Sequence, residues 1–328
     1  MRELRRFQTM LSVIIPVYRS EANLPRLLEE LGRIAGRSPI PIEVVLVVDG
    51  SPDRSLEILR RELAGCPFSS VLVSLSRNFG AFNAVRCGLE IASGDFMVML
   101  AADLQEPADL ALTFLEVLQT GEADIVFGTP STRDDPWFDE TSSRLFWKAY
   151  RRFVLPEVPP AGVHTVGCTR TVRNRLLELR EPTTNLIALL FWLGFRRVHI
   201  PYDRQQRREG RSAWSLGKKL RYGLDSVFSF TDLQIRILLA VGVLGTVAAV
   251  AFGGLLLAAY AAGRVPVPGY APTILTIVFF GSITSLGLGI VGQYAWLILQ
   301  NTRGRPSYLV DRVDHYPMTT APPASRPA

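Results

Sequence analysis

The chain has 328 residues, a net charge of +6 and a hydrophobic fraction of 48%, which is enough for one sizeable core with appended segments. A basic chain suits nucleic acid, anionic lipid or phosphorylated ligands. No nucleic-acid groove is visible in the sequence, because the aromatic and basic residues that do occur together, at 202–221, directly precede a hydrophobic stretch. We therefore expect no nucleic-acid partner and favour membrane surfaces and phosphates. The cysteines lack metal-ligand spacing and predict reduced core residues of a cytosol-facing domain: Cys66, Cys87 and Cys168.

Strand and helix patterns alternate along the first 128 residues. Continuous apolar runs predict five strands, at 11–17, 42–48, 71–75, 96–100 and 124–128. Apolar residues at helical spacing, together with turn and cap residues, predict helices between them, at 21–34, 54–63, 81–92 and 107–119. This alternation predicts a doubly wound, mainly parallel sheet of the α/β class.

The pattern becomes less regular after residue 130 and then strongly basic. Further helical pieces are expected at 143–154, 173–179 and 186–193. Between 202 and 221 the chain carries seven Lys and Arg residues with aromatic and leucine residues among them. Such a segment, placed before a hydrophobic stretch, predicts interfacial helices on an anionic leaflet; a solvated face of a soluble domain is the alternative.

Two long uncharged stretches follow. Between Arg236 and Arg264 there are 27 uncharged residues, and between Arg264 and Arg303 there are 38. About 20 apolar residues span a bilayer, so each stretch predicts one transmembrane helix of a hairpin. Cations on both outer flanks place both termini in the cytoplasm, in a multi-pass protein of the inner membrane. Glycines in the spans permit tight helix packing, so formation of a homo-oligomer is left open.

The predicted organisation therefore has four parts. A cytoplasmic α/β domain is expected at 1–210 and juxtamembrane interfacial helices at 211–234. Two transmembrane helices follow at 235–302, and a cytoplasmic C-terminal tail at 303–328.

Polar residues follow the ends of four predicted strands, which meet at one edge of a parallel sheet. Asp103 and Gln105 are two apart, so they point the same way in extended chain, and their oxygens suit Mg²⁺ or Mn²⁺ that already holds a phosphate. The alternative for Asp103 is a helix cap in a solvated loop. Tyr18 suits stacking, Asp49 suits a base or ribose, and Arg77 suits a phosphate. Together these loops predict a nucleotide-diphosphate site.

Seven motifs occur in an order that resembles a known family: Ser12-Val-Ile-Ile-Pro-Val-Tyr18, Val48-Asp-Gly-Ser-Pro-Asp53, Arg77-Asn-Phe-Gly80, Ala102-Asp-Leu-Gln-Glu-Pro107, Arg207-Arg-Glu-Gly-Arg-Ser212, Gly292-Gln-Tyr294 and Arg305-Pro-Ser-Tyr308. The chain resembles family 2 glycosyltransferases of the GT-A fold. Within them it resembles the branch of dolichyl-phosphate mannose synthase and the bacterial polyprenyl-phosphate glycosyltransferases, including the bactoprenol glucosyltransferase type. The resemblance spans roughly residues 11–310.

The resemblance implies an inverting transfer of sugar from a nucleoside-diphosphate sugar to a polyprenyl phosphate, of undecaprenyl or dolichyl type, at the cytoplasmic face. By position, Asp103 and Gln105 would bind the Mg²⁺ or Mn²⁺, and Asp103 and Arg207 would be the catalytic residues. The donor nucleotide sugar would be held by Pro16, Tyr18, Glu21, Asp49, Arg77, Ala102 and Arg133. The acceptor phosphate would be bound by Arg207, Arg211 and Ser212.

The sequence departs from the family pattern at several acids and lysines. Val48 and Ala101 stand where the family usually has Asp, and Ala81 and Ala213 stand where it often has Lys. An acid often found in the loop after the first strand falls at Ser20. Altered metal use, another lipid-linked glycan acceptor, and a non-catalytic membrane scaffold that binds nucleotide sugar are therefore kept as alternatives.

Overall fold

The computed structural model describes residues 9–131, 162–179, 186–205 and 270–319, with residues 157 and 159 and scattered positions between 238 and 262. The chain folds into two compact units, Met1–Lys219 with Pro306–Ala328, and Leu220–Arg305. The segment predicted as a C-terminal tail therefore contributes to the first unit.

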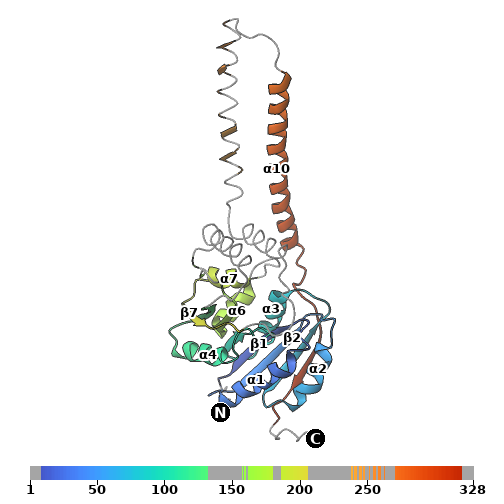
Figure 1. Cartoon of the computed structure of the whole chain (residues 1–328), viewed down its shortest axis with the longest axis vertical. Coiled ribbons are helices and arrows are strands. Elements are labelled where there is room, and N and C mark those ends of the chain that lie inside the picture. Colours follow the sequence, from blue (N-terminus) through green and yellow to red (C-terminus); the bar gives the residue numbers. More distant parts are fainter. Residues whose placement is uncertain are drawn as a thin grey trace, which may run out of the picture. The chain divides into compact units, whose positions relative to one another are not determined.

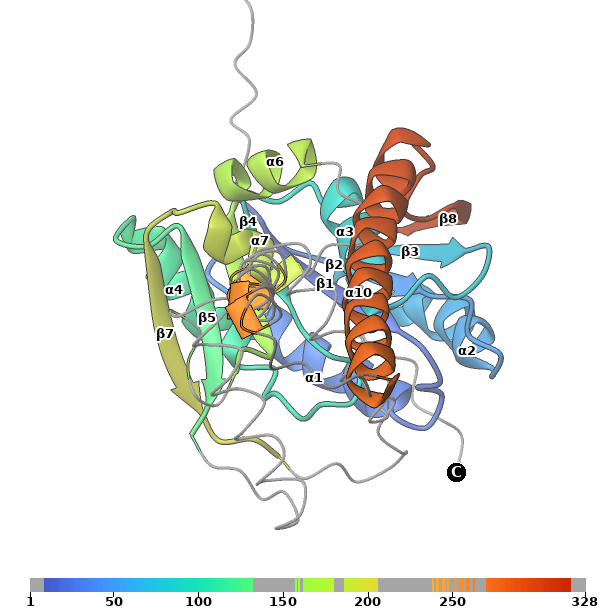
Figure 2. The ribbon, with the colours of Figure 1, turned by 90° about the horizontal axis from the view of Figure 1, so that it is seen from above.

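The first unit is built on a sheet in the order β7-β5-β6-β4-β1-β2-β3-β8, counted over the described residues. Figure 2 shows β7 and β8 at its opposite edges. The strands are β1 (Leu11–Val17), β2 (Ile42–Val48), β3 (Ser69–Leu75), β4 (Phe96–Met99), β5 (Ile125–Pro130), β6 (Thr165–Thr169), β7 (Arg197–Tyr202) and β8 (Val310–Tyr316). The helices of this unit are α1 (Leu24–Arg37), α2 (Ser55–Glu62), α3 (Ala81–Ile91), α4 (Leu110–Thr120), α6 (Arg170–Glu178) and α7 (Leu186–Trp192), with a 3₁₀ turn at Leu63–Gly65.

Helices cover both faces of the sheet, as the doubly wound prediction requires (Figure 1). On one face, alternate residues of β1 join the apolar core formed with α1, α2 and α4. On the other face, α3 approaches the strands at Gly88, where an added Cβ would lie 2.4 Å from the Cγ2 atom of Ile14. Both faces of β1 are therefore buried, which explains why its sequence is apolar without alternation.

The sheet is mixed, so the prediction of a mainly parallel sheet is only partly right. Strand β1 pairs in parallel with β2 and β4, and the pairs β2–β3 and β5–β7 are also parallel. Strand β6 runs antiparallel to β4 and β5, and β8 runs antiparallel to β3. Strands β6, β7 and β8 were not predicted, because β6 is short and the other two carry charged or exposed residues at the edges of the sheet.

Side-chain contacts tie β8 to the rest of the first unit. Asp311 accepts a hydrogen bond from the Ser74 hydroxyl at 3.2 Å, and Asp314 pairs with Arg60 at 3.4 Å. Just before β8, the Tyr308 hydroxyl donates to a carboxylate oxygen of Glu90 at the end of α3. Polar side chains of β8 therefore hold this edge strand to β3 and α2.

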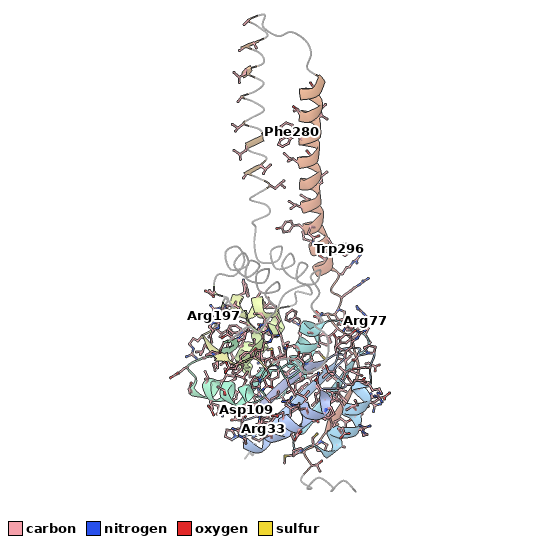
Figure 3. All side chains as sticks on the ribbon, viewed as in Figure 1. Arg33, Arg77, Asp109, Arg197, Phe280 and Trp296 are labelled. Atoms are coloured by element: carbon pink, nitrogen blue, oxygen red, sulfur yellow. The ribbon has the colours of Figure 1, made fainter. Side chains whose placement is uncertain are left out.

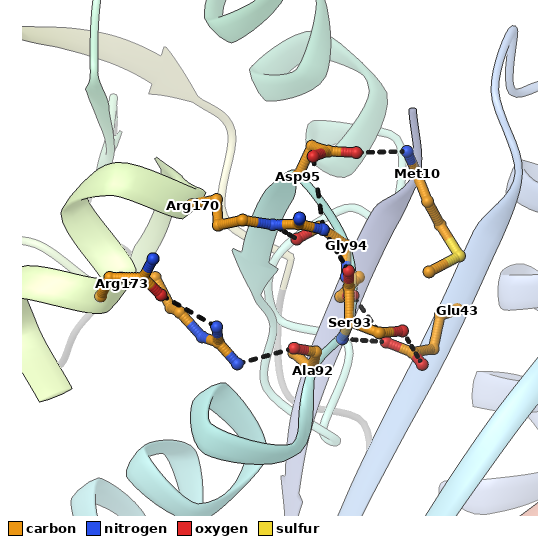
Figure 4. Close-up of polar contacts among 10 residues, drawn as sticks. Met10, Glu43, Ala92, Ser93, Gly94, Asp95, Arg170 and Arg173 are labelled. Atoms are coloured by element: carbon orange, nitrogen blue, oxygen red, sulfur yellow. Dashed lines mark hydrogen bonds and ion pairs between the residues drawn. The ribbon is translucent and has the colours of Figure 1, made fainter. Parts of the chain in front are cut away.

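Helices α3 and α6 cap each other. Arg86 of α3 donates to the carbonyl oxygens of Leu177 and Leu179 at the end of α6, at 3.0 and 2.6 Å. Arg173 of α6 donates in turn to the last carbonyls of α3, and Figure 4 shows its bond to Ala92 at 2.8 Å. A helix end leaves carbonyl groups without partners, and a cation there also opposes the negative end of the helix dipole. The two arginines therefore fix α3, whose other end lies at the candidate site.

A buried acid stabilises the amino-terminal end of the sheet. Glu43, which is 8% exposed, accepts hydrogen bonds from the Ser12 hydroxyl at 2.7 Å and from the Ser93 N–H and hydroxyl at 2.9 and 2.6 Å (Figure 4). A buried carboxylate is tolerated only when its oxygens have such partners. Because this cluster lies at the opposite end of the strands from the predicted site, we assign it to the scaffold.

The second unit contains α10 (Tyr270–Thr302), after which the Arg303 guanidinium lies 5.9 Å from the centre of the Trp296 ring. Within the part of the chain that the structure describes, no helix combines the length and the hydropathy that crossing a membrane would need. The transmembrane hairpin therefore stays a prediction. The interfacial helices expected at 211–234 lie outside the described residues.

Candidate active site

A crevice is expected where β1 and β4 meet. Strands β1, β2 and β3 follow one another in one direction across the sheet, and β4 lies on the other side of β1. The loops after β1 and β4 therefore lead away from each other, and open α/β sheets bind their ligands at such a switch point, beyond the carboxyl ends of the strands.

Pro16 lies at this switch point. The ladder between β1 and β4 ends at the pair Ile14 and Met99, and the Ile14 carbonyl accepts a hydrogen bond from the Leu100 N–H at 3.0 Å. Alternate residues of a strand face the same neighbour, so Pro16 faces the side of β4 just beyond the last pair. Its missing N–H therefore costs no ladder hydrogen bond. Its contact with a nucleotide stays a prediction.

The loops after β1 and β2 are joined by hydrogen bonds. The N–H of Arg19 donates to the Ser51 hydroxyl at 2.7 Å, and the N–H of Glu21 donates to Asp53 at 3.1 Å. The Glu21 carboxylate accepts from the N–H of Arg54 at 3.0 Å. Burial raises the pKa of Asp53, but hydrogen bonds from Ser51 and other neighbours outweigh that effect and lower it. Glu21, which the sequence predicted to bind the nucleotide sugar, thus connects the loops after β1 and β2 in this structure.

Asp49 braces the loop after β3. It is 2% exposed, and its two carboxylate oxygens accept hydrogen bonds from the N–H groups of Phe79 at 2.7 Å and Gly80 at 2.8 Å. These groups precede the first turn of α3, so the carboxylate acts as a cap there. Burial raises the pKa of Asp49, and the two N–H groups and Arg77 oppose the rise. Its predicted role toward a base or ribose is untested.

Two predicted donor-binding side chains extend into solvent around these loops. Tyr18 is 37% exposed, with the Arg19 guanidinium 5.5 Å from its ring centre. Arg77 lies 4.1 Å from the centre of the Phe79 ring and donates to the Asn78 carbonyl at 3.2 Å. Figure 3 labels Arg77 on its loop. Both side chains are therefore accessible to a ligand.

The loop after β4 carries the predicted metal ligands. Asp103 and Gln105 are partly exposed, whereas their neighbours Ala102, Leu104 and Glu106 are buried. Both predicted ligands therefore reach solvent, but the prediction that they point the same way assumed an extended chain, which this loop is not. The N–H of Gln105 donates to Asp103 at 3.3 Å, and Leu104 has a φ of +55°. A left-handed conformation is rare for leucine and is a source of backbone strain at functional loops.

Residues after β7 contact this loop, although the sequence predicted them as the start of a basic interfacial segment and not as neighbours of Asp103 and Gln105. Arg204 donates its Nη2 to the Gln105 amide oxygen at 2.8 Å, and the N–H of Gln205 donates to the Gln105 carbonyl at 2.9 Å. Glu106 is only 6% exposed, and its burial together with the charge of Asp103 raises its pKa to about 7. The only sequence signal for Glu106 was its alternation with Asp103 and Gln105.

The oxygen ligands at this loop can be judged against the needs of a divalent ion. The described residues hold no group of three or more His, Cys, Asp or Glu side chains arranged around a metal position. Mg²⁺ is commonly held by one or two carboxylates together with waters and substrate phosphates. Asp103 fits that mode, because it is partly exposed at the crevice. The amide oxygen of Gln105 accepts a hydrogen bond from Arg204 and keeps a second lone pair, so its role as a metal ligand stays a prediction.

Four residues of the sequence prediction lie outside the described residues. They are the phosphate-binding candidates Arg133, Arg207, Arg211 and Ser212. Their roles stay predictions.

Comparison with known proteins identifies the family. Residues 12–179 match the family model for glycosyl transferase family 2. A glycosyltransferase of Synechocystis is 31% identical over 92% of this chain and 94% of its own length. The undecaprenyl-phosphate 4-deoxy-4-formamido-L-arabinose transferase of Aeromonas hydrophila is 29% identical, over 93% and 94%. The bactoprenol glucosyl transferase of Shigella phage SfX is 26% identical, over 92% and 98%.

Among solved structures, a Pyrobaculum calidifontis mannosyltransferase in complex with GDP-Man and Mn²⁺ is 18% identical and covers 91% of this chain and 88% of its own, with a TM-score of 0.44. That score is too low to establish the fold by itself. The match to the family model and the similarity to glycosyltransferases over most of the chain establish the family. The chain belongs to glycosyl transferase family 2 and is a glycosyltransferase.

Proposed function

We propose that this enzyme transfers a sugar, with inversion, from a nucleoside-diphosphate sugar to a polyprenyl phosphate at the cytoplasmic face of the inner membrane. The observation that carries the proposal is the similarity to two enzymes whose names specify bactoprenol or undecaprenyl phosphate. It covers 92–93% of this chain and therefore includes its hydrophobic last third. The two uncharged stretches, of 27 and 38 residues, support a membrane hairpin beside the catalytic domain.

The chemistry of the crevice supports the same reaction. A lipid phosphate is already an anion at pH 7, so it needs little help from a general base. The difficult step is stabilising the diphosphate as it leaves the sugar carbon. Asp103 would hold Mg²⁺ or Mn²⁺ here, and the bound ion would supply positive charge to the leaving diphosphate. The braces at Asp49 and Asp53 keep the surrounding loops in place for the donor.

The test uses membranes that contain the full chain, labelled nucleotide sugars, Mn²⁺ and undecaprenyl phosphate. We expect a lipid-linked monosaccharide of matching mass, and a drop of about 100-fold with Asp103→Asn, the range seen when electrostatic stabilisation of a transition state is removed. The control is Glu122→Gln, an exposed acid beyond α4, which should keep wild-type activity.

Other outcomes would contradict the proposal in different ways. A labelled product on a larger lipid-linked glycan would move the acceptor to the alternative class. Absence of product with every common donor, combined with nucleotide-sugar binding, would favour the scaffold alternative that Val48 and Ala101 suggested.

A further inference from the structure

Two chain segments that are 99 residues apart meet at the crevice. The Arg204 Nη2 lies 2.8 Å from the Gln105 amide oxygen, and the Gln205 N–H bonds the Gln105 carbonyl at 2.9 Å. Strands β7 and β4 are not neighbours, because β5 and β6 lie between them in the sheet. The chain after β7 therefore crosses the carboxyl edge of the sheet to reach the loop after β4.

The contact continues into a buried polar cluster of Glu106, Tyr202 and Arg204. Glu106 and Tyr202 are 6% and 5% exposed. Burial, followed by the charge of Glu106, raises the pKa of Tyr202, so the Tyr202 hydroxyl and the Glu106 carboxylate face each other inside the cluster. The buried Nε of Arg204 has no hydrogen-bond partner among the described residues, and its Nη2 is the group that reaches Gln105. The guanidinium also opposes the effect of Asp103 on the pKa of Glu106, so it acts on the charges of this loop.

The neighbouring pocket does not offer a better site. It has a volume of about 110 Å³, and Arg33, Asp109, Glu106 and Gln205 are among its lining residues. Figure 3 labels two of these lining residues, Arg33 and Asp109. Their ion pair at 2.5 Å satisfies both charges, so this pocket has no evident preference for an anion. We therefore expect the cluster of Glu106, Tyr202 and Arg204 to act on the loop after β4 and not on this pocket.

The loop needs support from outside its own sequence. Leu104 has a left-handed φ of +55°, and such strain persists only where the surroundings hold it. The Arg204 and Gln205 hydrogen bonds fall on Gln105, the next residue, and so they are placed to hold it.

We propose that Arg204 is a positioning residue, which acts through Gln105 to keep Asp103 in the orientation that binds a divalent ion and the donor diphosphate. Gln105 is then the link between Arg204 and the loop, and this link is compatible with its predicted role as a metal ligand, because the amide oxygen has two lone pairs. The role of this site in sugar transfer rests on the proposed function. The contact by which Arg204 holds the loop after β4 does not depend on it.

The test measures binding of Mn²⁺ with inorganic pyrophosphate to the full chain in detergent, by calorimetry and Mn²⁺ spectroscopy. Pyrophosphate represents the diphosphate without a choice of base or sugar. We expect Arg204→Met and Gln105→Ala each to weaken binding about tenfold, and the double variant to be no weaker than either, because both remove one interaction. Arg204→Lys, which keeps a donor and the charge, should recover most of the loss.

A matched control comes from the other end of β7. Arg196 precedes β7, is exposed and pairs with Asp124 at 3.0 Å, so Arg196→Met should leave pyrophosphate binding unchanged. If Arg204→Met fails to fold, Gln105→Ala and Arg204→Lys still measure the link, because Gln105 is only partly buried and Arg204→Lys keeps the charge.

Three results would overturn the inference: unchanged binding in Arg204→Met, losses that multiply in the double variant, or a wild-type chain that does not bind Mn²⁺ with pyrophosphate. Failure of the proposed function would look different. In that case no lipid product would form, while the coupling between Arg204 and Gln105 would still be measured.

Discussion

Asp49 has two possible roles that one substitution can separate. The sequence predicts that it binds the nucleotide, whereas in the structure its carboxylate holds the loop after β3. Its oxygens accept from the Phe79 and Gly80 N–H groups at 2.7 and 2.8 Å, and the residue is 2% exposed. Asp49→Ala would leave both N–H groups without an acceptor. Both hydrogen bonds are part-buried, so each lost acceptor should cost about 1.5 kcal/mol, toward the lower end of the range of about 1–3 kcal/mol for an unpaired donor, and we expect a loss of about 3 kcal/mol in the free energy of unfolding.

Asp49→Asn gives an intermediate case. The amide keeps one oxygen as an acceptor and turns an NH₂ group toward the second N–H, so the loss should be about 2 kcal/mol. For a domain of this size, 1 kcal/mol shifts the melting temperature by about 2–4 °C. Thermal denaturation of the full chain in detergent should therefore show a fall of about 6–12 °C for Asp49→Ala. Glu122→Ala, at an exposed position, should change it by less than about 2 °C.

The same variants also test the sequence-based interpretation. If Asp49→Ala melts like the wild type but binds UDP or GDP more than about tenfold less tightly, the brace argument is refuted and Asp49 contacts the nucleotide. If the melting temperature falls and the nucleotide affinity of the folded protein changes little, the brace is confirmed.

Three further predictions follow from the described residues. Gly50→Ala should abolish or severely reduce folding, because Gly50 has a φ of +55° and its added Cβ would lie 2.3 Å from the Arg77 carbonyl carbon; expression of soluble protein checks this against Gly36→Ala, whose Cβ meets nothing within 4 Å. Arg173→Met should lower the free energy of unfolding by about 2 kcal/mol, because it removes hydrogen bonds to the end of α3; equal denaturation midpoints for this variant and Arg175→Met, which loses only an exposed ion pair, would contradict the capping argument. Burial raises the pKa of the Cys66 thiol to about 11 and those of the Cys87 and Cys168 thiols to about 12, so all three are protonated at pH 8 and should react with a disulfide reagent only after denaturation. Fast reaction of the native protein would show that one of these thiols is accessible.

The parallel part of the sheet could be predicted because its strands are buried on both faces. Strands β1 and β2 begin and end where the apolar runs begin and end, at 11–17 and 42–48. Helices that cover both faces leave no solvated positions in such a strand, so the apolar pattern is nearly unbroken and easy to locate; Ser12 and Glu43 are polar but buried and hydrogen-bonded to each other. Strands β7 and β8 lie at the sheet edges and carry charged residues, which removed the apolar signal.

The candidate site was predictable to the extent that it follows from strand ends. The loops at Tyr18, Asp49, Arg77 and Asp103 each follow a parallel strand, and parallel strands end at the same edge. The pattern could not indicate that the carboxylate of Asp49 bonds the loop after β3, because its partners are backbone N–H groups, which every residue but proline offers.

The sequence alone therefore determined the family, the order of the parallel strands along the chain and the residues at their carboxyl ends. Only the tertiary structure decided that Arg204 meets Gln105 and that the segment after α10 returns to pair with β3. The physical reason is that period and burial act on neighbouring residues, whereas these contacts depend on the order of strands across the sheet. That order is set by packing of the whole domain.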